Sequence, residues 1–110
     1  MSEEGDDYAR RVAKQEINGR RVNEAIERGR LGNRSDAAFV CECGRLGCND
    51  TLSLSLPEYE AVRTSFDRFF LVPGHELPPV DKVVERHDGY LVVIKAEGEA
   101  REMAAETDPR

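Results

Sequence analysis

This sequence has little apolar material for a folded core. It contains no tryptophan, three tyrosines and four phenylalanines, and its hydrophobic fraction is 39% against 35% charged residues. It has no apolar run near the ~18 residues of a membrane-spanning helix, and its acidic start lacks the apolar segment of a secretory signal. We therefore expect one small cytoplasmic domain that does not engage a membrane and whose lean core needs further support.

Cysteine is absent except in one short stretch, Cys41-Glu42-Cys43-Gly44-Arg45-Leu46-Gly47-Cys48. In a reducing compartment, clustered cysteines are more typical of metal ligands or redox thiols than of disulfides, and an odd number leaves one thiol unpaired. A Cys-x-Cys pair can chelate an ion from one extended segment. Gly44 and Gly47 let the backbone turn, so that Cys48 reaches the same ion. The spacing predicts a bound metal.

A structural Zn²⁺ site takes four Cys or His ligands, so one more is needed. His75 is the first choice because it lies in a stiff loop with prolines on both sides, and His87, beside a predicted turn, is the second. An iron–sulfur cluster and metal-free thiols are alternatives. A catalytic zinc with Glu42 or Glu76 as general base is the least favoured. The predicted zinc ligands are Cys41, Cys43, Cys48 and His75.

The charge is unevenly distributed. Residues 8–34 hold eight basic and three acidic side chains, a net charge of +5, which leaves −11 for the rest of a chain whose total is −6. A basic segment of this kind suits an acidic partner or nucleic acid. It is equally typical of a solvated helix whose charges meet its own acidic body, and the interleaved acids favour that interpretation.

Hydrophobic spacing predicts the elements. A helix is expected from Asp6 or Asp7 to about Arg28, after an acidic lead at 1–7. Its apolar stripe is narrow, and Asn18-Gly19 makes two shorter helices an alternative. Strands are expected at 37–43, 51–56, 80–87 and 90–95, with Asp88-Gly89 as a hairpin turn. Short helices are expected at 57–65, after a capping box at Ser55 to Glu58, and at 97–105.

These elements predict an α+β fold: an N-terminal helix, then a small antiparallel sheet with one packed helix, clipped together by zinc. The narrow apolar stripe of the expected N-terminal helix comprises Tyr8, Val12, Ile17, Val22, Ala25 and Ile26. Phe66 and residues 69–72 form the most apolar patch and are expected to be buried in the core. Three parts follow: an acidic lead and basic helical arm at 1–34, a zinc-stabilised core at 35–96, and a short helix and tail at 97–110.

Several segments resemble a group of small uncharacterised actinobacterial proteins. They are FVCECGRLGC, LPEYEAVRTSFDRFFLVPGHELP, VVERHDGYLVVIK and the closing AAETDPR, and the basic N-terminal helix is similar as well. The CECG…C and PGHE elements are the most recognisable. The resemblance implies that Cys41, Cys43, Cys48 and His75 occur together as a set in this group. It implies no biochemical activity.

No phosphate-binding glycine loop, Ser-His-Asp arrangement or HExxH motif is present, so we expect no enzyme. The favoured function is a zinc-binding interaction module, regulatory in role, that engages an unidentified protein partner through residues 8–30. A homo-oligomer is compatible with this. A nucleic-acid-binding protein using the same helix is the first alternative, disfavoured by the acidic body. A zinc–thiol redox sensor is the second.

Overall fold

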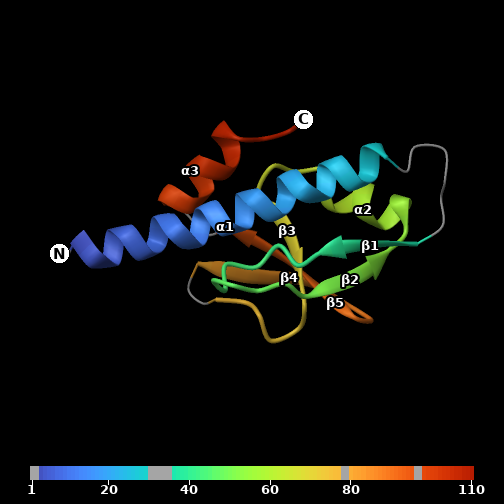
Figure 1. Cartoon of the computed structure of the whole chain (residues 1–110), viewed down its shortest axis with the longest axis horizontal. Helices are drawn as coiled ribbons and strands as arrows, with labels where there is room; N and C mark the ends of the chain where they lie inside the picture. Colours follow the sequence, from blue (N-terminus) through green and yellow to red (C-terminus); the bar gives the residue numbers. More distant parts are fainter. Residues whose placement is uncertain (1–2, 30–35, 78–79, 96–97) are drawn as a thin grey trace.

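The fold is a small α+β arrangement in which one long helix runs along two antiparallel sheets (Figure 1). The computed structural model describes residues 3–29, 36–77, 80–95 and 98–110. The elements in chain order are α1 (Glu3–Arg28), β1 (Ala37–Val40), β2 (Thr51–Leu54), α2 (Leu56–Val62), β3 (Arg68–Leu71), β4 (Asp81–His87), β5 (Tyr90–Lys95) and α3 (Glu99–Glu106). The predicted fold class is confirmed.

The two predicted hairpins are present, but they belong to separate sheets. Strands β1 and β2 pair from Ala37 opposite Leu54 to Val40 opposite Thr51. Strands β4 and β5 pair across the Asp88-Gly89 turn, where Gly89 has φ +89°. The first strand ends at Val40 rather than at residue 43, so the cysteines lie beyond the ladder.

Strand β3 is the element that hydrophobic spacing does not predict. It pairs with β5 on the side opposite β4, so that β5 is central. Phe70 enters one core cluster, with Phe39 and Tyr59, while Phe69 and Leu71 enter a second cluster that also contains the cysteines. Because both faces of β3 are covered from Phe69 to Leu71, these three residues are all apolar and lack the alternation of a half-exposed strand.

Helix α2 begins as its sequence predicts. Glu58 N–H donates to the Ser55 hydroxyl, and Ser55 N–H donates to the Glu58 carboxylate at 2.8 Å, which completes a capping box. Tyr59 and Val62 point inward and are buried. Burial of this face holds the short helix against β3.

Helix α1 continues unbroken through Gly19 to Arg28, which confirms the prediction of a single helix, but it differs from that prediction in two ways. It already begins at Glu3, so described residues of the expected acidic lead are helical, and its buried face is not the expected apolar stripe. A β-carbon on Gly19 would lie 3.3 Å from Cα of Glu42, so this glycine allows close packing of the helix. Of the predicted stripe, Val12 and Ile17 are buried, whereas Tyr8, Val22 and Ala25 are exposed. The buried face is completed by polar side chains, Glu16, Arg20, Asn23, Glu24 and Glu27.

The C-terminal helix α3 packs against α1. Arg20 of α1 fixes this contact, because its guanidinium donates to the carbonyl oxygens of Phe66 at 2.7 Å and Ala104 at 2.9 Å. The boundary expected at residue 34 between arm and core lies outside the described residues. The division into three parts stays a prediction.

Candidate metal centre

The four predicted ligands come together in space. The ligand atoms of Cys41, Cys43, Cys48 and His75 all lie within 4.8 Å of one another. Nδ1 of His75 lies 3.6 Å from the sulfur of Cys41 and 3.6 Å from that of Cys48. A tetrahedral zinc with bonds of ~2.3 Å to sulfur and ~2.0 Å to nitrogen separates two such ligands by ~3.5 Å. The arrangement can therefore bind a metal ion.

The two sides of the site come from different sheets. Cys41 and Cys43 follow β1 in an extended segment, where alternation directs both cysteines to one side and Glu42 to the other. Backbone bonds anchor this segment, from Cys41 N–H to the Asp50 carbonyl and from Glu42 N–H to the Phe70 carbonyl, each 2.9 Å. Hairpin β1–β2 is thereby fixed against β3.

Two glycine turns bring Cys48 and His75 into the site. The first runs from Arg45 to Cys48, closed by a 3.0 Å bond, with Gly47 at φ +83°. The second runs from Val72 to His75, also closed at 3.0 Å, with Gly74 at φ +94°. A Pro-Gly pair at the centre of this second turn is typical of type II geometry. The proline-bounded loop that carries His75 therefore contains an ordered turn.

Backbone N–H groups favour the ionised form of the cysteine sulfurs. Val72 N–H donates to the Cys41 sulfur at 3.2 Å, and the backbone amides of Arg45 and Asp50 act to lower the pKa of Cys43 and Cys48, respectively. Such donors favour the thiolate, which is the form that ligates metal. The sulfurs are thus prepared for negative charge.

The thiols nevertheless do not all ionise by themselves. A hydrogen bond from Cys41 is the main cause that lowers the pKa of Cys43 to about 5, and the same bond together with burial raises the pKa of Cys41. Burial likewise raises the pKa of Cys48. Neighbouring thiolates repel one another, so full deprotonation needs a compensating cation.

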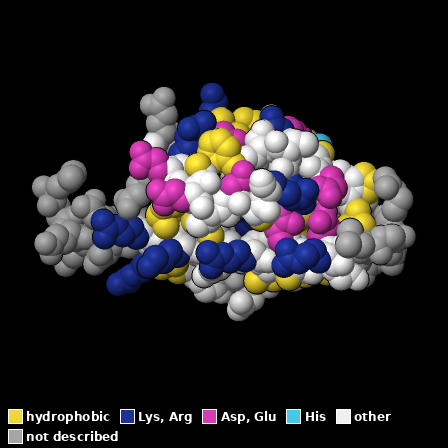
Figure 2. All heavy atoms as spheres, turned by 90° about the horizontal axis from the view of Figure 1, so that it is seen from above, with side chains coloured by type: hydrophobic (Ala, Val, Ile, Leu, Met, Phe, Trp, Pro, Cys, Tyr) yellow, Lys and Arg dark blue, Asp and Glu magenta, His cyan; other side chains and the backbone are white. Residues whose placement is uncertain are grey.

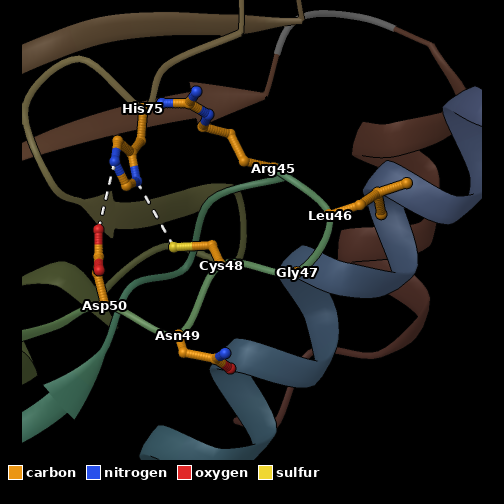
Figure 3. Close-up of a pocket in the computed structure, with 7 residues that line it drawn as sticks. All are labelled: Arg45, Leu46, Gly47, Cys48, Asn49, Asp50 and His75. Carbon is orange, nitrogen blue, oxygen red and sulfur yellow. Dashed lines mark hydrogen bonds and ion pairs between the residues drawn. The ribbon is translucent and has the colours of Figure 1, made fainter.

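His75 has a second partner that orients its ring. Its Nε2 lies 3.5 Å from Oδ2 of Asp50, while Nδ1 faces the sulfurs (Figure 3). A carboxylate on the far nitrogen of a ligating histidine fixes its tautomer and increases its basicity. Sequence reasoning missed Asp50. Its only signal was its nearness to Cys48, since nothing in the pattern connects it to His75.

The other candidates lie away from the cluster. His87 Nε2 is 2.7 Å from the Glu85 carboxylate, and its ring stacks on Tyr90 at 4.5 Å between centroids. The Glu76 carboxylate accepts a bond of 2.8 Å from Gly74 N–H. The structure therefore groups His75, and not His87, with the three cysteines.

Glu42 belongs to a buried ionic network behind the cysteines. It is fully buried and forms an ion pair with Arg63, and it accepts bonds from the Asn23 amide at 2.7 Å and from Phe70 N–H at 3.3 Å. Its carboxylate is thereby directed away from the sulfurs. This network, which joins α1 and α2 to the cysteine segment, was not anticipated from the sequence.

No protein-family model, curated protein or solved structure was found to match this chain. The resemblance to the actinobacterial group therefore stays a prediction. Among the described residues, no helix is long and apolar enough to cross a membrane. The fold and the four clustered side chains define a small α+β protein with a candidate Cys₃His metal centre.

Proposed function

We propose that this protein is a non-enzymatic interaction module stabilised by one structural Zn²⁺. The observation that carries the proposal is the convergence of three sulfurs and one imidazole nitrogen within 4.8 Å. Thiolate and imidazole ligands suit zinc, and four of them fill a tetrahedron. A filled tetrahedron leaves no position for a reactive water, which favours a structural over a catalytic ion. The close spacing favours one ion over a cluster of several irons.

The ion would act as a clip between the two sheets. The cysteines belong to the β1–β2 hairpin and its loop, and His75 belongs to the loop after β3, so zinc binding would add a direct link between two sheets that already share core contacts such as Phe39 with Phe70. Zinc binding adds directly to folding free energy in small domains. This role fits a chain in which only 39% of residues are hydrophobic.

The interaction role rests on helix α1. Its inner face is buried in its own domain, so the opposite face of α1, within the described residues 8–28, is the one available to a partner. A protein partner, and a regulatory role through it, is the favoured proposal. Nucleic-acid binding by the same face remains the alternative, and a zinc–thiol switch would act through the half-buried Cys48.

The test is metal content and affinity of the purified full chain. His75→Ala is the diagnostic variant, and His87→Ala is its matched control because it removes the other imidazole. We expect one zinc per chain in the wild type and in His87→Ala, with weakened binding in His75→Ala. Cobalt substitution should give the intense absorption of a tetrahedral thiolate site. A metal-free wild type, or unchanged affinity in His75→Ala, would contradict the proposal.

A further inference from the structure

Helix α1 separates its charges between two faces. Glu16, Glu24 and Glu27 are 1%, 5% and 7% exposed, so the acids that interleave with bases in the sequence all point inward. Besides Arg10, four further bases of α1 are exposed on its outward side, Arg11, Lys14, Arg21 and Arg28. We call these four residues the basic stripe. Folding thus converts a mixed-charge segment into a surface on which every described charged side chain of α1 is basic.

The basic stripe is regular and long. Its members are separated by three, seven and seven residues, so they lie on one side of the helix. At 1.5 Å per residue the stripe extends over ~25 Å. Figure 2 shows a row of Lys and Arg side chains along the molecule where α1 runs. Asn18, Val22 and Ala25, also exposed, lie among these bases.

The charge of the stripe is not compensated within the described part of the chain. None of its four side chains makes an ion pair there. The inward carboxylates are compensated instead: Lys95 pairs with Glu16, and Arg110 lies 3.0 Å from Glu24 and 3.5 Å from Glu27. The stripe's positive charge is therefore available to an external partner.

We propose that the basic stripe docks a helix of a partner protein that carries Asp or Glu at heptad spacing. This inference deepens the proposed function and rests on it. A helix lying alongside α1 repeats its side chains at the same seven-residue interval, so its acids can meet successive stripe residues. Val22, which is 47% exposed, and Ala25 offer an apolar seam between those charges.

Nucleic acid fits the same surface less well. Residues outside 8–34 carry a net charge of −11, which repels a phosphate backbone approaching the body. Helix α1 is also buried along its inner face and cannot enter a groove as an isolated helix. An acidic helix, by contrast, can lie along the outer face of α1 without approaching the acidic body of the protein.

The experiment uses the zinc-loaded full chain and a labelled helical peptide of three heptads with glutamate at the first and fourth positions of each. Probes for comparison are a peptide of identical composition in scrambled order and a short DNA duplex. The stripe variant is Lys14→Gln with Arg21→Gln. Its matched control, Lys82→Gln with Arg86→Gln, removes one exposed lysine and one exposed arginine from β4.

We expect the heptad peptide to bind more tightly than the scrambled one, and the stripe variant to weaken binding about fivefold or more, while the control changes it less than about twofold. Binding should weaken as salt rises. Equal binding of both peptides, tighter stripe-dependent binding of DNA, or self-association through the stripe would overturn the inference. Zinc content is measured in parallel: a metal-free wild type contradicts the zinc module, whereas a zinc-loaded chain that binds no peptide contradicts only the stripe.

Discussion

The side-chain amide of Asn23 donates a 2.7 Å hydrogen bond to Oε2 of Glu42, so α1 is joined to the residue between the first two cysteines. Asn23 also pairs with Val40 through both its amide nitrogen and its carbonyl oxygen, at 2.9 and 2.8 Å. The candidate metal centre and α1 are therefore coupled through the extended segment that carries Cys41, Glu42 and Cys43: its cysteines face His75, and Glu42 faces Asn23.

Replacing Glu42 with glutamine should destabilise the fold strongly. Arg63 would remain buried without an opposite charge, and among the described residues its Nε and Nη1 already lack hydrogen-bond partners. Breaking one side of a buried ion pair costs about 3 kcal/mol or more. Urea unfolding of zinc-loaded protein measures the change. The exposed Glu102→Gln is the control and should stay within about 0.5 kcal/mol; equal effects of both variants would contradict the network's role.

Replacing either of two glycines in the cysteine loop, Gly44 or Gly47, should lower the stability of the fold, but for different reasons. A β-carbon on Gly44 would overlap Cγ1 of Val12 and lie 3.1 Å from Cδ1 of Leu77, so Gly44→Ala should cost about 1–3 kcal/mol by overpacking. Gly47 has open space around it but a φ of +83°, so Gly47→Ala should cost about 1 kcal/mol by backbone strain.

A second substitution distinguishes the two mechanisms. Val12→Ala should restore part of the stability lost in Gly44→Ala, because it removes the overlapping methyl group. It should leave the cost of Gly47→Ala unchanged, since the two sites share no contact. Thermal unfolding of the single and double variants provides the comparison. Additive effects at Gly44 and Val12 would show that the close approach is not what limits this position.

The parts of the structure that follow simple spacing rules could be predicted from the sequence. Alternation gave the β1–β2 hairpin, Asp88-Gly89 gave the β4–β5 turn, and the Ser55 to Glu58 pattern gave the start of α2. The cysteine spacing, together with a histidine between prolines, predicted the four side chains that converge. In each case the chemistry that decides the structure is local.

What the sequence could not give depends on long-range compensation of polar groups. The inner face of α1 is half polar because its partners come from elsewhere, with Arg20 bonded to Phe66 and Ala104 and Glu16 paired with Lys95. A search for an apolar stripe cannot find such a face. The same reason hides the charge distribution of α1, in which acidic side chains point inward and basic side chains point outward. This distribution reverses the argument that interleaved acids disfavour a basic surface.

Asp50→Asn should weaken zinc binding without removing it. The carboxylate lies 3.5 Å from Nε2 of His75 and orients the ring that would ligate through Nδ1. Loss of such an outer partner costs about tenfold or more in affinity, and the lower end is expected because the Asp50 side chain is 60% exposed. Competition with a chelator measures the change. Asn49→Ala, the exposed neighbour, should bind as the wild type does; a shared loss would indicate a general loop effect.

Glu16 should make stability depend on pH. It and Asp81 share the single ammonium of Lys95, and burial raises the pKa of Glu16 from its usual 4.5 to about 7. Its Oε1 has no hydrogen-bond partner among the described residues. Between these two values the folded protein retains a proton that the unfolded chain has lost, so folding becomes less favourable as pH rises. Below about 4.5 both states are protonated, and above about 7 both are ionised, so the effect is confined to this interval.

Glu16→Gln cannot lose that proton. The difference in unfolding free energy between the variant and the wild type should therefore shift in favour of the variant, by up to about 3 kcal/mol, as pH rises from 4.5 to 7. Chemical unfolding across this range measures the difference, and comparing two zinc-loaded chains at each pH cancels the proton linkage of metal binding. Glu102→Gln should give a difference that does not vary with pH. A flat difference for Glu16→Gln would mean that Lys95 keeps the carboxylate ionised in the folded protein.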